Sequence, residues 1–373
     1  MRIFETVIAG DIMKAYRNIL IIKMSSLGDI LHALPTLAAL RRNLPEARIS
    51  WAVHDAFADM LPGTPWIDEI IRIDRKRLKS PSYLVRLRRD LHARRFDMCL
   101  DLQCIAKSAV VSALSGASEK YGYWELREGS GLVNKPLVGA HKFGHVIERY
   151  LDTVRALDGT VGGIEFPLPV YEEAAVKVEA LLRDAFGSER ADEGIDMTDE
   201  SDMNGKEKDA YVVIAPGARR AIKEWPPERF GEVAKRLVAG GMRVVLVGAA
   251  AEVPLCEAVI HAAGRTEGLV SLAGRTNLHE LTELVRGAKM FLSADTGPLH
   301  LANALRIPLV ALYGPTSPER TGPYGGADAT YIHIVVSPTS KATTDEPIVD
   351  DPDCMAAIDV DIVMQSIESA MKI

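Results

Sequence analysis

An acidic residue directly after a run of apolar residues is the first candidate for chemistry. Residues 19–22 are aliphatic, as is typical of a strand buried on both faces of a parallel sheet, and a turn with Ser25, Ser26 and Gly28 follows. Either serine can cap the next helix, so Asp29 falls in its first turn, where the helix dipole favours an ionised carboxylate. Asp29 thus lies at the carboxyl edge of a predicted sheet, where open α/β folds bind ligands. It is either a functional carboxylate or an ordinary helix-start residue.

A loop with positive charge follows a later apolar run. In residues 215–226, Gly217 permits close approach of the backbone, and Arg219, Arg220 and Lys223 supply cations. Such a loop can hold a phosphate, with Lys223 neutralising the charge that develops on a leaving group. Surface loops often carry Lys and Arg, so this pattern alone is a weak signal.

A third candidate is the segment 293–302, where Asp295, Thr296 and Gly297 lead into a predicted helix. The free N–H groups of the first turn and the positive end of the helix dipole form an anion site. His300 lies on the same helix, where it either hydrogen-bonds a nucleotide or has a structural role. Residues 312–318 repeat the order of strand end, glycine and hydroxyl groups.

These candidates follow predicted strands in a chain that alternates strands with helices. Strands are expected near 19–23, 48–53, 69–73, 96–101, 210–215, 243–247, 290–293 and 309–312. Helices are expected near 29–43, 81–93, 104–115, 171–186, 227–239, 251–263, 277–286, 298–305 and 358–372. The alternation predicts two doubly wound α/β domains, at 1–165 and 170–340, with a ligand cleft between them. A last helix, at 355–373, is expected to cross back to the first domain.

Charge is concentrated in two segments. Residues 188–209 contain nine acidic against three basic residues, hold most of the net charge of −7, and are expected to be a mobile insertion. Residues 72–95 contain ten Arg and Lys against two Asp. They either attract an anionic glycolipid and the membrane that bears it, or form a solvated helix face. Nucleic acid is not expected, because no recognition motif accompanies the charge.

Composition is that of an ordinary soluble globular protein, with 47% apolar and 25% charged residues. Charged residues interrupt the first 17 positions, and no uncharged span suits a membrane helix, so a cytoplasmic protein without a signal peptide is expected. The four cysteines lack zinc spacing and are expected to be reduced thiols. The Asp-x-Asp strings at 351–353 and 359–361 are interpreted as solvated or capping residues rather than as a metal site.

Taken in order, these segments resemble the lipopolysaccharide heptosyltransferases, the ADP-heptose-using glycosyltransferases of family 9. The resemblance rests on residues 23–32 (KMSSLGDILH), 223–226 (KEWP), 295–300 (DTGPLH), 313–316 (YGPT) and 354–358 (CMAAI). It implies a GT-B fold, in which two Rossmann-like domains face across a cleft, the first holding the acceptor and the second the sugar nucleotide. The implied reaction is an inverting transfer of heptose from ADP-L-glycero-D-manno-heptose to the Kdo or first heptose of the inner core.

The resemblance also implies roles for individual residues. Asp29 matches the proposed general base, and Lys223 matches the residue near the diphosphate. These roles agree with the chemistry of an inverting transfer, which needs a base for the acceptor hydroxyl and a positive charge beside the negatively charged leaving group. The implied nucleotide-binding residues are Gly217, Ala218, Arg219, Lys223, Asp295, Thr296, Gly297, His300 and, in the adenosine-side region 272–279, Leu272. The expected acceptor-binding residues are Ser25, Ser26 and His32, with Gln103 and Lys107 after the strand at 96–101.

The expected partners are ADP-heptose, Kdo-lipid A or heptosyl-Kdo-lipid A, and the cytoplasmic face of the inner membrane, with no metal or other cofactor. Residues 217–219 resemble the type II enzymes and residues 23–29 the type I enzymes, which leaves the acceptor open. Two other classes also remain open, another GT-B enzyme such as a sugar-nucleotide epimerase and a protein that binds the nucleotide without catalysis. A nicotinamide dehydrogenase fits less well, because no GxGxxG follows a strand with an acidic residue about 20 residues later.

Overall fold

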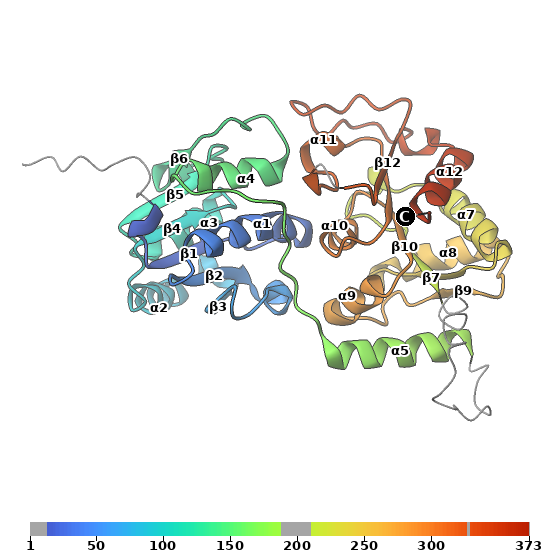
Figure 1. Cartoon of the computed structure of the whole chain (residues 1–373), viewed down its shortest axis with the longest axis horizontal. Helices are drawn as coiled ribbons and strands as arrows, with labels where there is room; N and C mark the ends of the chain where they lie inside the picture. The colour runs from blue at the N-terminus through green and yellow to red at the C-terminus, as the bar shows by residue number, and fades with distance from the viewer. Residues whose placement is uncertain (1–12, 188–209, 327–328, 373) are drawn as a thin grey trace, which may run out of the picture. The chain divides into compact units, whose positions relative to one another are not determined.

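The chain folds as two compact units, one up to Pro169 and the other from Val170. The computed structural model describes residues 13–187, 210–326 and 329–372 (Figure 1). The predicted acidic insertion at 188–209 lies outside the described residues. The division after Pro169 falls between the predicted end of the first domain, at 165, and the predicted start of the second, at 170.

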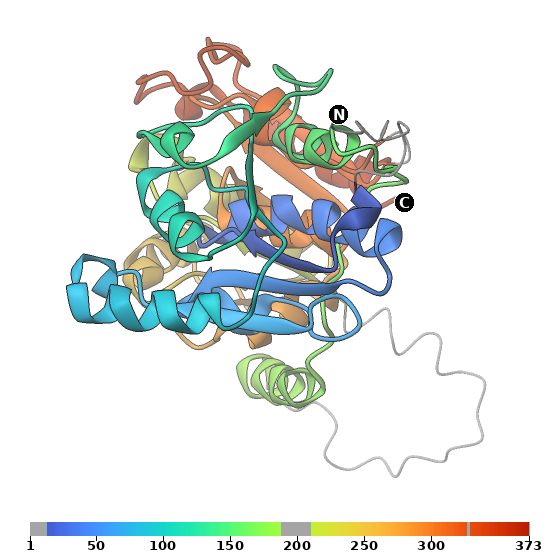
Figure 2. The same cartoon turned by 90° about the vertical axis from the view of Figure 1, so that its left-hand side faces the viewer.

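The first unit is built around a parallel sheet of six strands in the order β3-β2-β1-β4-β5-β6. Its strands are β1 (Asn18–Ile22), β2 (Arg48–His54), β3 (Glu69–Ile73), β4 (Met98–Asp101), β5 (Glu119–Tyr123) and β6 (Lys135–Leu137). Its α-helices are α1 (Leu27–Asn43), α2 (Pro81–His92), α3 (Ala106–Leu114) and α4 (Val146–Arg155). Helix α1 packs with α4 and helix α2 with α3, one pair on each face of the sheet (Figure 2).

The position of β1 explains its apolar sequence. It pairs with β2 on one side and with β4 on the other, and its four aliphatic residues are fully buried. Leu20 and Ile22 enter the core that contains Leu87 and Leu91 of α2. A strand covered on both faces has no solvated position, so polar residues begin only where β1 ends, at Lys23.

The second unit repeats this plan, with the strand order β12-β11-β10-β7-β8-β9. Its strands are β7 (Tyr211–Ala215), β8 (Arg243–Leu246), β9 (Leu269–Ser271), β10 (Met290–Ala294), β11 (Leu309–Tyr313) and β12 (Ile332–Val336). Its α-helices are α5 (Glu172–Phe186), α7 (Pro227–Ala239), α8 (Val253–Ala263), α9 (Leu278–Arg286), α10 (Gly297–Ala304), α11 (Pro318–Thr321) and α12 (Val360–Ala370). Alternate residues of β7 enter opposite cores. Val212 and Ile214 pack with α7, α8 and α12, whereas Val213 and Ala215 pack with α5, α9 and α10.

The predicted α/β class is confirmed, and every predicted strand and helix is present with ends within two residues of those expected. Strands β5, β6, β9 and β12 and helices α4 and α11 were not predicted. Three of these strands lie at a sheet edge and β5 lies next to one. An edge strand has solvent on one side and tolerates charged residues and proline, such as Lys135 and Pro136 of β6, so the apolar signal is weak there.

Two further expectations concern the state of the cysteines and the presence of membrane-spanning helices. The four cysteines are free, as predicted, and all four are buried. Within the described ranges, no helix has both the length and the apolar character needed to cross a membrane.

The C-terminal helix belongs to the second unit, which corrects the prediction that residues 355–373 cross back to the first domain. Val363, Ile367 and Ala370 of α12 are fully buried in a core shared with β11, β12 and α7 (Figure 1). The preceding residues are held on the same unit, because Trp225 Nε1 and an Arg229 guanidinium nitrogen both donate to the Ile358 carbonyl. A sequence reveals that a helix has an apolar face, but packing alone decides which surface covers that face.

Burial of Ile367 provides a test of this assignment. Ile367→Ala should destabilise the second unit by about 2–5 kcal/mol, because it removes buried methyl groups and leaves a cavity. Ile362→Ala on the same helix is the matched control, since Ile362 is 51% exposed. Its truncation should change stability by about 0.5 kcal/mol or less. Native-state hydrogen exchange of the β11 and β12 amides measures both effects, and equal losses for the two variants would contradict the assignment.

Candidate active site

In each unit the strand order reverses beside the first strand. The chain runs from β1 to β2 and β3 on one side of the sheet, and from β4 to β5 and β6 on the other. The second unit has the same arrangement at β7 and β10. Open α/β sheets bind ligands at such a point, beyond the carboxyl ends of the strands. The segments with Asp29, Gln103, Lys223 and Asp295 follow β1, β4, β7 and β10 respectively.

Asp29 is anchored at the start of α1 by the residue that caps the helix. Its Oδ2 accepts hydrogen bonds from the N–H (3.0 Å) and the hydroxyl (2.7 Å) of Ser26. Its Oδ1 lies 3.8 Å from Lys23 Nζ, and the side chain is 46% exposed. One carboxylate oxygen is therefore held in place while the group stays open to a ligand, which is the arrangement that a general base requires.

No role was predicted for Lys23, the buried cation beside Asp29. Its Nζ donates to the Leu102 carbonyl (2.9 Å) and to the Tyr150 hydroxyl (2.7 Å). Burial raises the pKa of Tyr150 well above its usual value and the charge of Asp29 acts in the same direction, so the phenol stays protonated. Lys23 thus presents a positive charge to Asp29 from inside the protein. The signal in the sequence is a charged residue directly after a fully apolar strand.

Gln103 joins the loop after β4 to the loop after β1. Its Oε1 accepts hydrogen bonds from the N–H groups of Met24 (2.9 Å) and Ser25 (3.2 Å). The buried Asp101 holds Gln103 in turn, because its Oδ1 accepts the N–H groups of Gln103 and Cys104, both at 2.9 Å. Burial raises the pKa of Asp101, although these donors act in the opposite direction. The Gln103 side chain thus supports the Asp29 loop through its oxygen, and its contact with an acceptor stays a prediction.

Lys107 lies in a basic pocket of about 700 Å³. The other cations of its lining come from the connection between β3 and α2: Arg75, Lys76 and Lys79. Arg75 Nη1 donates to Ser25 Oγ at 3.4 Å, which links this pocket to the loop after β1. The structure therefore brings the predicted acceptor residues Ser25 and Lys107 to one region of the first unit.

His32 is a predicted acceptor residue that the structure places in the protein interior. It is 3% exposed, and its ring packs edge-to-face against the ring of His145, with 5.8 Å between centroids. His145 begins α4, which packs against α1. Because a buried ring has no surface to offer a ligand, we assign His32 to the packing of these two helices and correct the prediction.

In the second unit, Lys223 and Asp295 form a close ion pair. Lys223 ends the short 3₁₀ helix η6 (Ala221–Lys223) after β7, and its Nζ lies 2.6 Å from Asp295 Oδ2. His300 of α10 lies with Nε2 at 3.6 Å from the other oxygen of the same carboxylate. The structure thus brings three predicted residues together at the carboxyl edge of the sheet.

Two opposing effects act on the Asp295 carboxylate. Burial acts to raise its pKa, but the hydrogen bond from His300 and the charge of Lys223 outweigh burial and hold the pKa well below its usual range. Asp295 is therefore ionised at neutral pH and compensates the charge of Lys223. Burial, together with the Asp295 charge, raises the pKa of the neighbouring Tyr313 well above its usual value.

Two glutamates approach the loop that was predicted to hold phosphate. A Cβ atom on Gly217 would clash with the Glu252 carboxylate, so the glycine lets this carboxylate lie against the backbone. The Ala218 N–H donates to Glu224 Oε1 at 3.3 Å, while Arg219 is exposed. Glu252, in the 3₁₀ helix η7 (Ala250–Glu252) after β8, was not predicted. The loop therefore carries acidic as well as basic groups.

Leu272 is a core residue, which corrects the assignment to the nucleotide site for its side chain, while a contact through its backbone stays a prediction. It is 0% exposed and packs in the core with Val245 and Leu284. Thr296 and Gly297 are half-buried at the start of α10, with Thr296 in the N-cap position. Pro298 follows them and has no N–H group, so the first turn offers one donor fewer than an ordinary helix.

The Asp-x-Asp strings form local hydrogen bonds. Asp359 Oδ1 accepts the Asp361 N–H (2.7 Å) at the start of α12, and Asp351 Oδ1 accepts the Asp353 N–H (3.2 Å). The first contact caps α12, in agreement with the interpretation of Asp359 as a capping residue, whereas the second lies in the turn at 352–354. In the parts of the chain that the structure describes, no three His, Cys, Asp or Glu side chains form a group that could hold a metal ion.

Comparison with known sequences identifies relatives of this chain. A profile described as glycosyltransferase family 9 (heptosyltransferase) matches residues 84–347, more than half of the chain. Lipopolysaccharide heptosyltransferase 1 of Pseudomonas aeruginosa is 28% identical over 323 residues, which cover 83% of this chain and 81% of that protein. Lipopolysaccharide heptosyltransferase 3 of Escherichia coli K12 is 27% identical over 306 residues, which cover 78% of this chain and 80% of that protein.

Solved structures show the same fold. The glycosyl transferase family 9 protein from Veillonella parvula has a TM-score of 0.75 at 20% identity, covering 96% of this chain and 97% of that chain. The E. coli heptosyltransferase WaaC with ADP has a TM-score of 0.69 at 24% identity, covering 95% of this chain and 99% of that chain. This likeness confirms the predicted GT-B fold class. The family match together with this fold identifies the chain as a member of glycosyltransferase family 9, the heptosyltransferases.

Proposed function

We propose that this enzyme transfers heptose from ADP-L-glycero-D-manno-heptose to the Kdo or heptose of a lipopolysaccharide inner core, with inversion at the anomeric carbon. The observation that carries the proposal is the Asp29 carboxylate, held by Ser26 through one oxygen and 46% exposed. The names of the relatives, lipopolysaccharide heptosyltransferases 1 and 3, support the class of acceptor. A solved relative in complex with ADP-2-deoxy-2-fluoro heptose supports an ADP-linked heptose as donor.

Asp29 is the proposed general base. It accepts the proton of the acceptor hydroxyl while that oxygen forms a bond to the anomeric carbon of the donor. The two hydrogen bonds from Ser26 limit the rotation of the carboxylate, and the nearby charge of Lys23 favours its ionised form before transfer. After transfer, the proton leaves Asp29 through its exposed side.

Lys223 is the proposed partner of the leaving group. When the bond between the anomeric carbon and the diphosphate oxygen breaks, the electron pair stays on ADP and the negative charge there increases. Lys223 and the N-terminal end of α10 supply positive charge to it. Asp295 keeps the ammonium group in place, so that the diphosphate shares Lys223 with this carboxylate. We propose that the reaction needs no metal, because these two features supply the compensating charge.

The acceptor is proposed to bind the first unit. The basic pocket with Lys107 and Arg75 suits an anionic saccharide, since Kdo carries a carboxylate and lipid A carries phosphates. Arg75 reaches Ser25 in the loop after β1, so a ligand in this pocket lies beside the loop that carries Asp29. The acceptor is part of a glycolipid, so we propose peripheral contact with the cytoplasmic face of the inner membrane through the basic segment 72–95.

Substitution of the base tests the mechanism. Asp29→Asn should lower the rate of heptosyl transfer by about 10²-fold or more, because the amide cannot accept the proton. The measurement is ADP release from ADP-heptose in the presence of EDTA, with Kdo-lipid A and separately with heptosyl-Kdo-lipid A as acceptor. The affinity for ADP should be unchanged, because the proposed nucleotide contacts lie in the second unit.

Three outcomes would count against the proposal. Activity of Asp29→Asn close to wild type would remove this carboxylate from the mechanism. Conversion of the donor to an isomerised sugar nucleotide without any acceptor would favour an epimerase. Loss of wild-type transfer on addition of EDTA, with recovery on addition of a divalent cation, would show that a metal takes part.

Lys23→Met tests the influence of the buried cation on the base. Removal of a positive charge 3.8 Å from Asp29 makes the ionised carboxylate less favourable, so the acidic limb of the profile of kcat/KM against pH should move to higher pH. Tyr150→Phe is the matched control, because it removes a hydrogen-bond partner of Lys23 but leaves the charge in place. The same profile for Lys23→Met and wild type would show that Lys23 has only a structural role.

Lys223→Met tests the charge balance of the second unit. The variant should bind ADP about 10- to 100-fold more weakly at neutral pH, because the buried Asp295 carboxylate then faces the diphosphate without its cation. Without Lys223, the pKa of Asp295 should rise, so ADP affinity of the variant should increase as the pH is lowered towards about 5. The double variant Lys223→Met/Asp295→Asn should lack this pH dependence. Calorimetric titration measures the ADP affinity of wild type, of Lys223→Met and of the double variant. A loss of ADP affinity in Lys223→Met that does not change with pH would contradict the account.

A further inference from the structure

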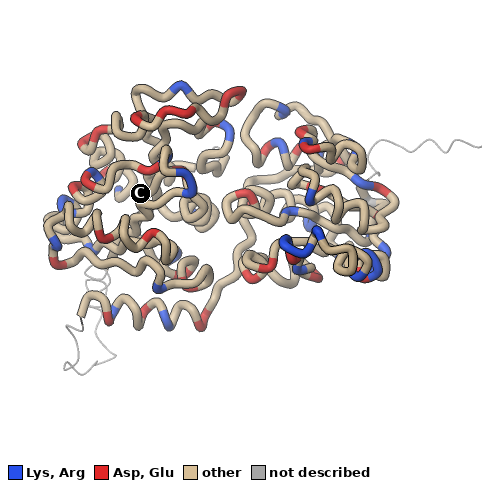
Figure 3. The backbone as a smooth tube through the Cα atoms, turned by 180° about the vertical axis from the view of Figure 1, so that it is seen from behind, with Lys and Arg blue, Asp and Glu red and all other residues tan. Residues whose placement is uncertain are grey.

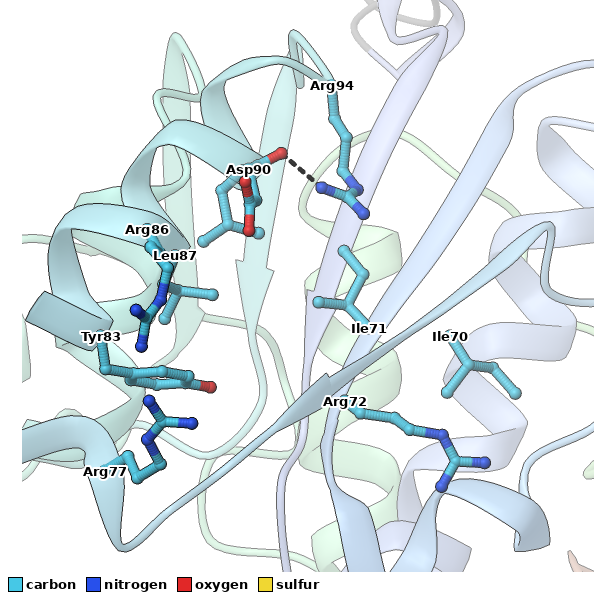
Figure 4. A pocket seen from close by; sticks show the side chains of 10 residues that line it. Ile70, Ile71, Arg72, Arg77, Tyr83, Arg86, Leu87, Asp90 and Arg94 are labelled. Carbon is cyan, nitrogen blue, oxygen red and sulfur yellow. Dashed lines mark hydrogen bonds between the residues drawn. The ribbon is translucent and has the colours of Figure 1, made fainter.

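A second pocket of the first unit lies away from the loop after β1, between the edge strand β3 and helix α2. Its volume is about 380 Å³, and its lining combines apolar side chains with four arginines (Figure 4). Nothing in the proposed transfer reaction uses it. The 3₁₀ helix η3 (Arg77–Lys79) separates the two pockets, because Arg77 lines this one while Lys76 and Lys79 line the other.

The floor of the β3–α2 pocket is apolar. Ile71 and Leu87 are each 7% exposed and Leu91 is fully buried, and Ile70 borders the pocket as a half-buried side chain. The Tyr83 ring closes one side, and its orientation is fixed because its hydroxyl accepts the Asp74 N–H at 3.0 Å. Such a floor favours a ligand with hydrocarbon next to its polar group.

Two of the four arginines are already engaged with carboxylates. Arg72 pairs with Asp55 and Asp59, and Arg94 pairs with Glu69. Arg94 also donates to the Asp90 carbonyl, as the dashed line in Figure 4 shows. These two side chains therefore shape the pocket walls rather than offer charge to a ligand.

Arg77 and Arg86 are the remaining cations of the lining. Among the described residues, neither forms an ion pair with a carboxylate. Arg77 stacks on the Tyr83 ring, with Cζ 5.1 Å from its centroid, and Figure 4 shows the Arg86 guanidinium on the other side of that ring. Both side chains are exposed, so their guanidinium groups can turn from the two sides of the ring to one phosphate or carboxylate anion at its edge. Asp90 also lines the pocket, and its carboxylate pairs with Arg89 at 3.4 Å.

The surroundings indicate where such a ligand comes from. Figure 3 shows Lys and Arg gathered over η3 and α2, and α2 also exposes Arg88, Arg89 and the apolar Val85, the last 69% exposed. A short helix with exposed arginines and an exposed apolar residue suits the interface of an anionic membrane. A free phosphate would use the two arginines but would leave the apolar floor without contacts.

We propose that the β3–α2 pocket binds one anionic phospholipid, with Arg77 and Arg86 on its phosphate and Ile70, Leu87 and Leu91 against the first methylene groups of its acyl chains. The site is separate from the pocket of the proposed acceptor. It rests on the proposed function in one respect, since a glycolipid acceptor requires the enzyme to work at a membrane. Binding at this site would hold the enzyme against the lipid surface independently of the acceptor.

The test uses the full chain and a short-chain lipid below its micelle concentration, so that no membrane surface is present. Wild type should bind monomeric dihexanoyl-phosphatidylglycerol, measured by calorimetric titration, with inorganic phosphate as a second probe. Arg77→Gln/Arg86→Gln should weaken lipid binding by about 10-fold or more, as expected for two charge-assisted hydrogen bonds. Arg88→Gln/Arg95→Gln is the matched control, because it removes the same charge from the same region but changes neither the pocket lining nor Arg89, the partner of Asp90, and it should stay within about twofold of wild type.

A floor variant tests the hydrocarbon contact. Ile70→Ala should weaken binding of the lipid but leave binding of inorganic phosphate unchanged. Ile70 is half-buried, and thermal unfolding of the variant, followed in parallel, shows that its fold is retained. Equal losses for the two arginine pairs, or no monomer binding by wild type, would show diffuse attraction to the membrane and overturn the site. Inorganic phosphate binding as tightly as the lipid would overturn the choice of ligand. None of these titrations contains donor or acceptor, so they remain informative if the proposed transfer activity fails.

Discussion

The reversal of strand order beside β1 and beside β7 is the constraint on which the proposed chemistry depends. Loops that follow neighbouring parallel strands emerge side by side, but helices cover most of them. Where the connections depart in opposite directions, the loops after the two central strands are free to contact each other. Gln103 reaches the backbone of Met24 and Ser25 in one unit, and Lys223 reaches Asp295 in the other. Each unit thus joins two segments that are about 70 to 80 residues apart in the chain.

Both units place a Lys–Asp pair at this point, but they bury different members of it. Lys23 is buried and Asp29 is 46% exposed, so the carboxylate is the group that a ligand meets. Lys223 and Asp295 are 17% and 10% exposed, and they are in direct contact at 2.6 Å. The nitrogen–oxygen distance is also longer in the pair whose carboxylate is exposed. Asp29 lies 3.8 Å from its cation and is bound through its other oxygen by Ser26, whereas the pKa of Asp295 is held well below its usual range by its direct partners. This difference is the basis for proposing the base in the first unit and the charge partner in the second.

The positive charge of the first unit is organised by structure rather than spread evenly. Some arginines in the segment 72–95 are committed to carboxylates, as Arg72 is to Asp55 and Asp59. Other basic residues of this segment divide between the two pockets at η3: Arg77 lines the β3–α2 pocket, whereas Lys79 and the preceding Lys76 line the pocket with Lys107. A short 3₁₀ helix places successive side chains on different sides, which lets one basic turn serve two separate surfaces.

Local sequence was sufficient for most of the elements, for the fold class and for the loops that carry the candidate site, because apolar runs, helix starts and glycines act over a few residues. It was also sufficient for the family, since the segments around Asp29, Lys223 and Asp295 occur in one order along the chain. Only the tertiary structure decided which groups meet. Tyr150 lies 127 residues from the Lys23 that it contacts, and Glu252 lies over Gly217 from a different strand connection. The same reason explains the corrections at His32, at Leu272 and in α12. A sequence shows that a residue or a helix face is apolar or polar, but the strand order and the packing of distant segments determine what covers it.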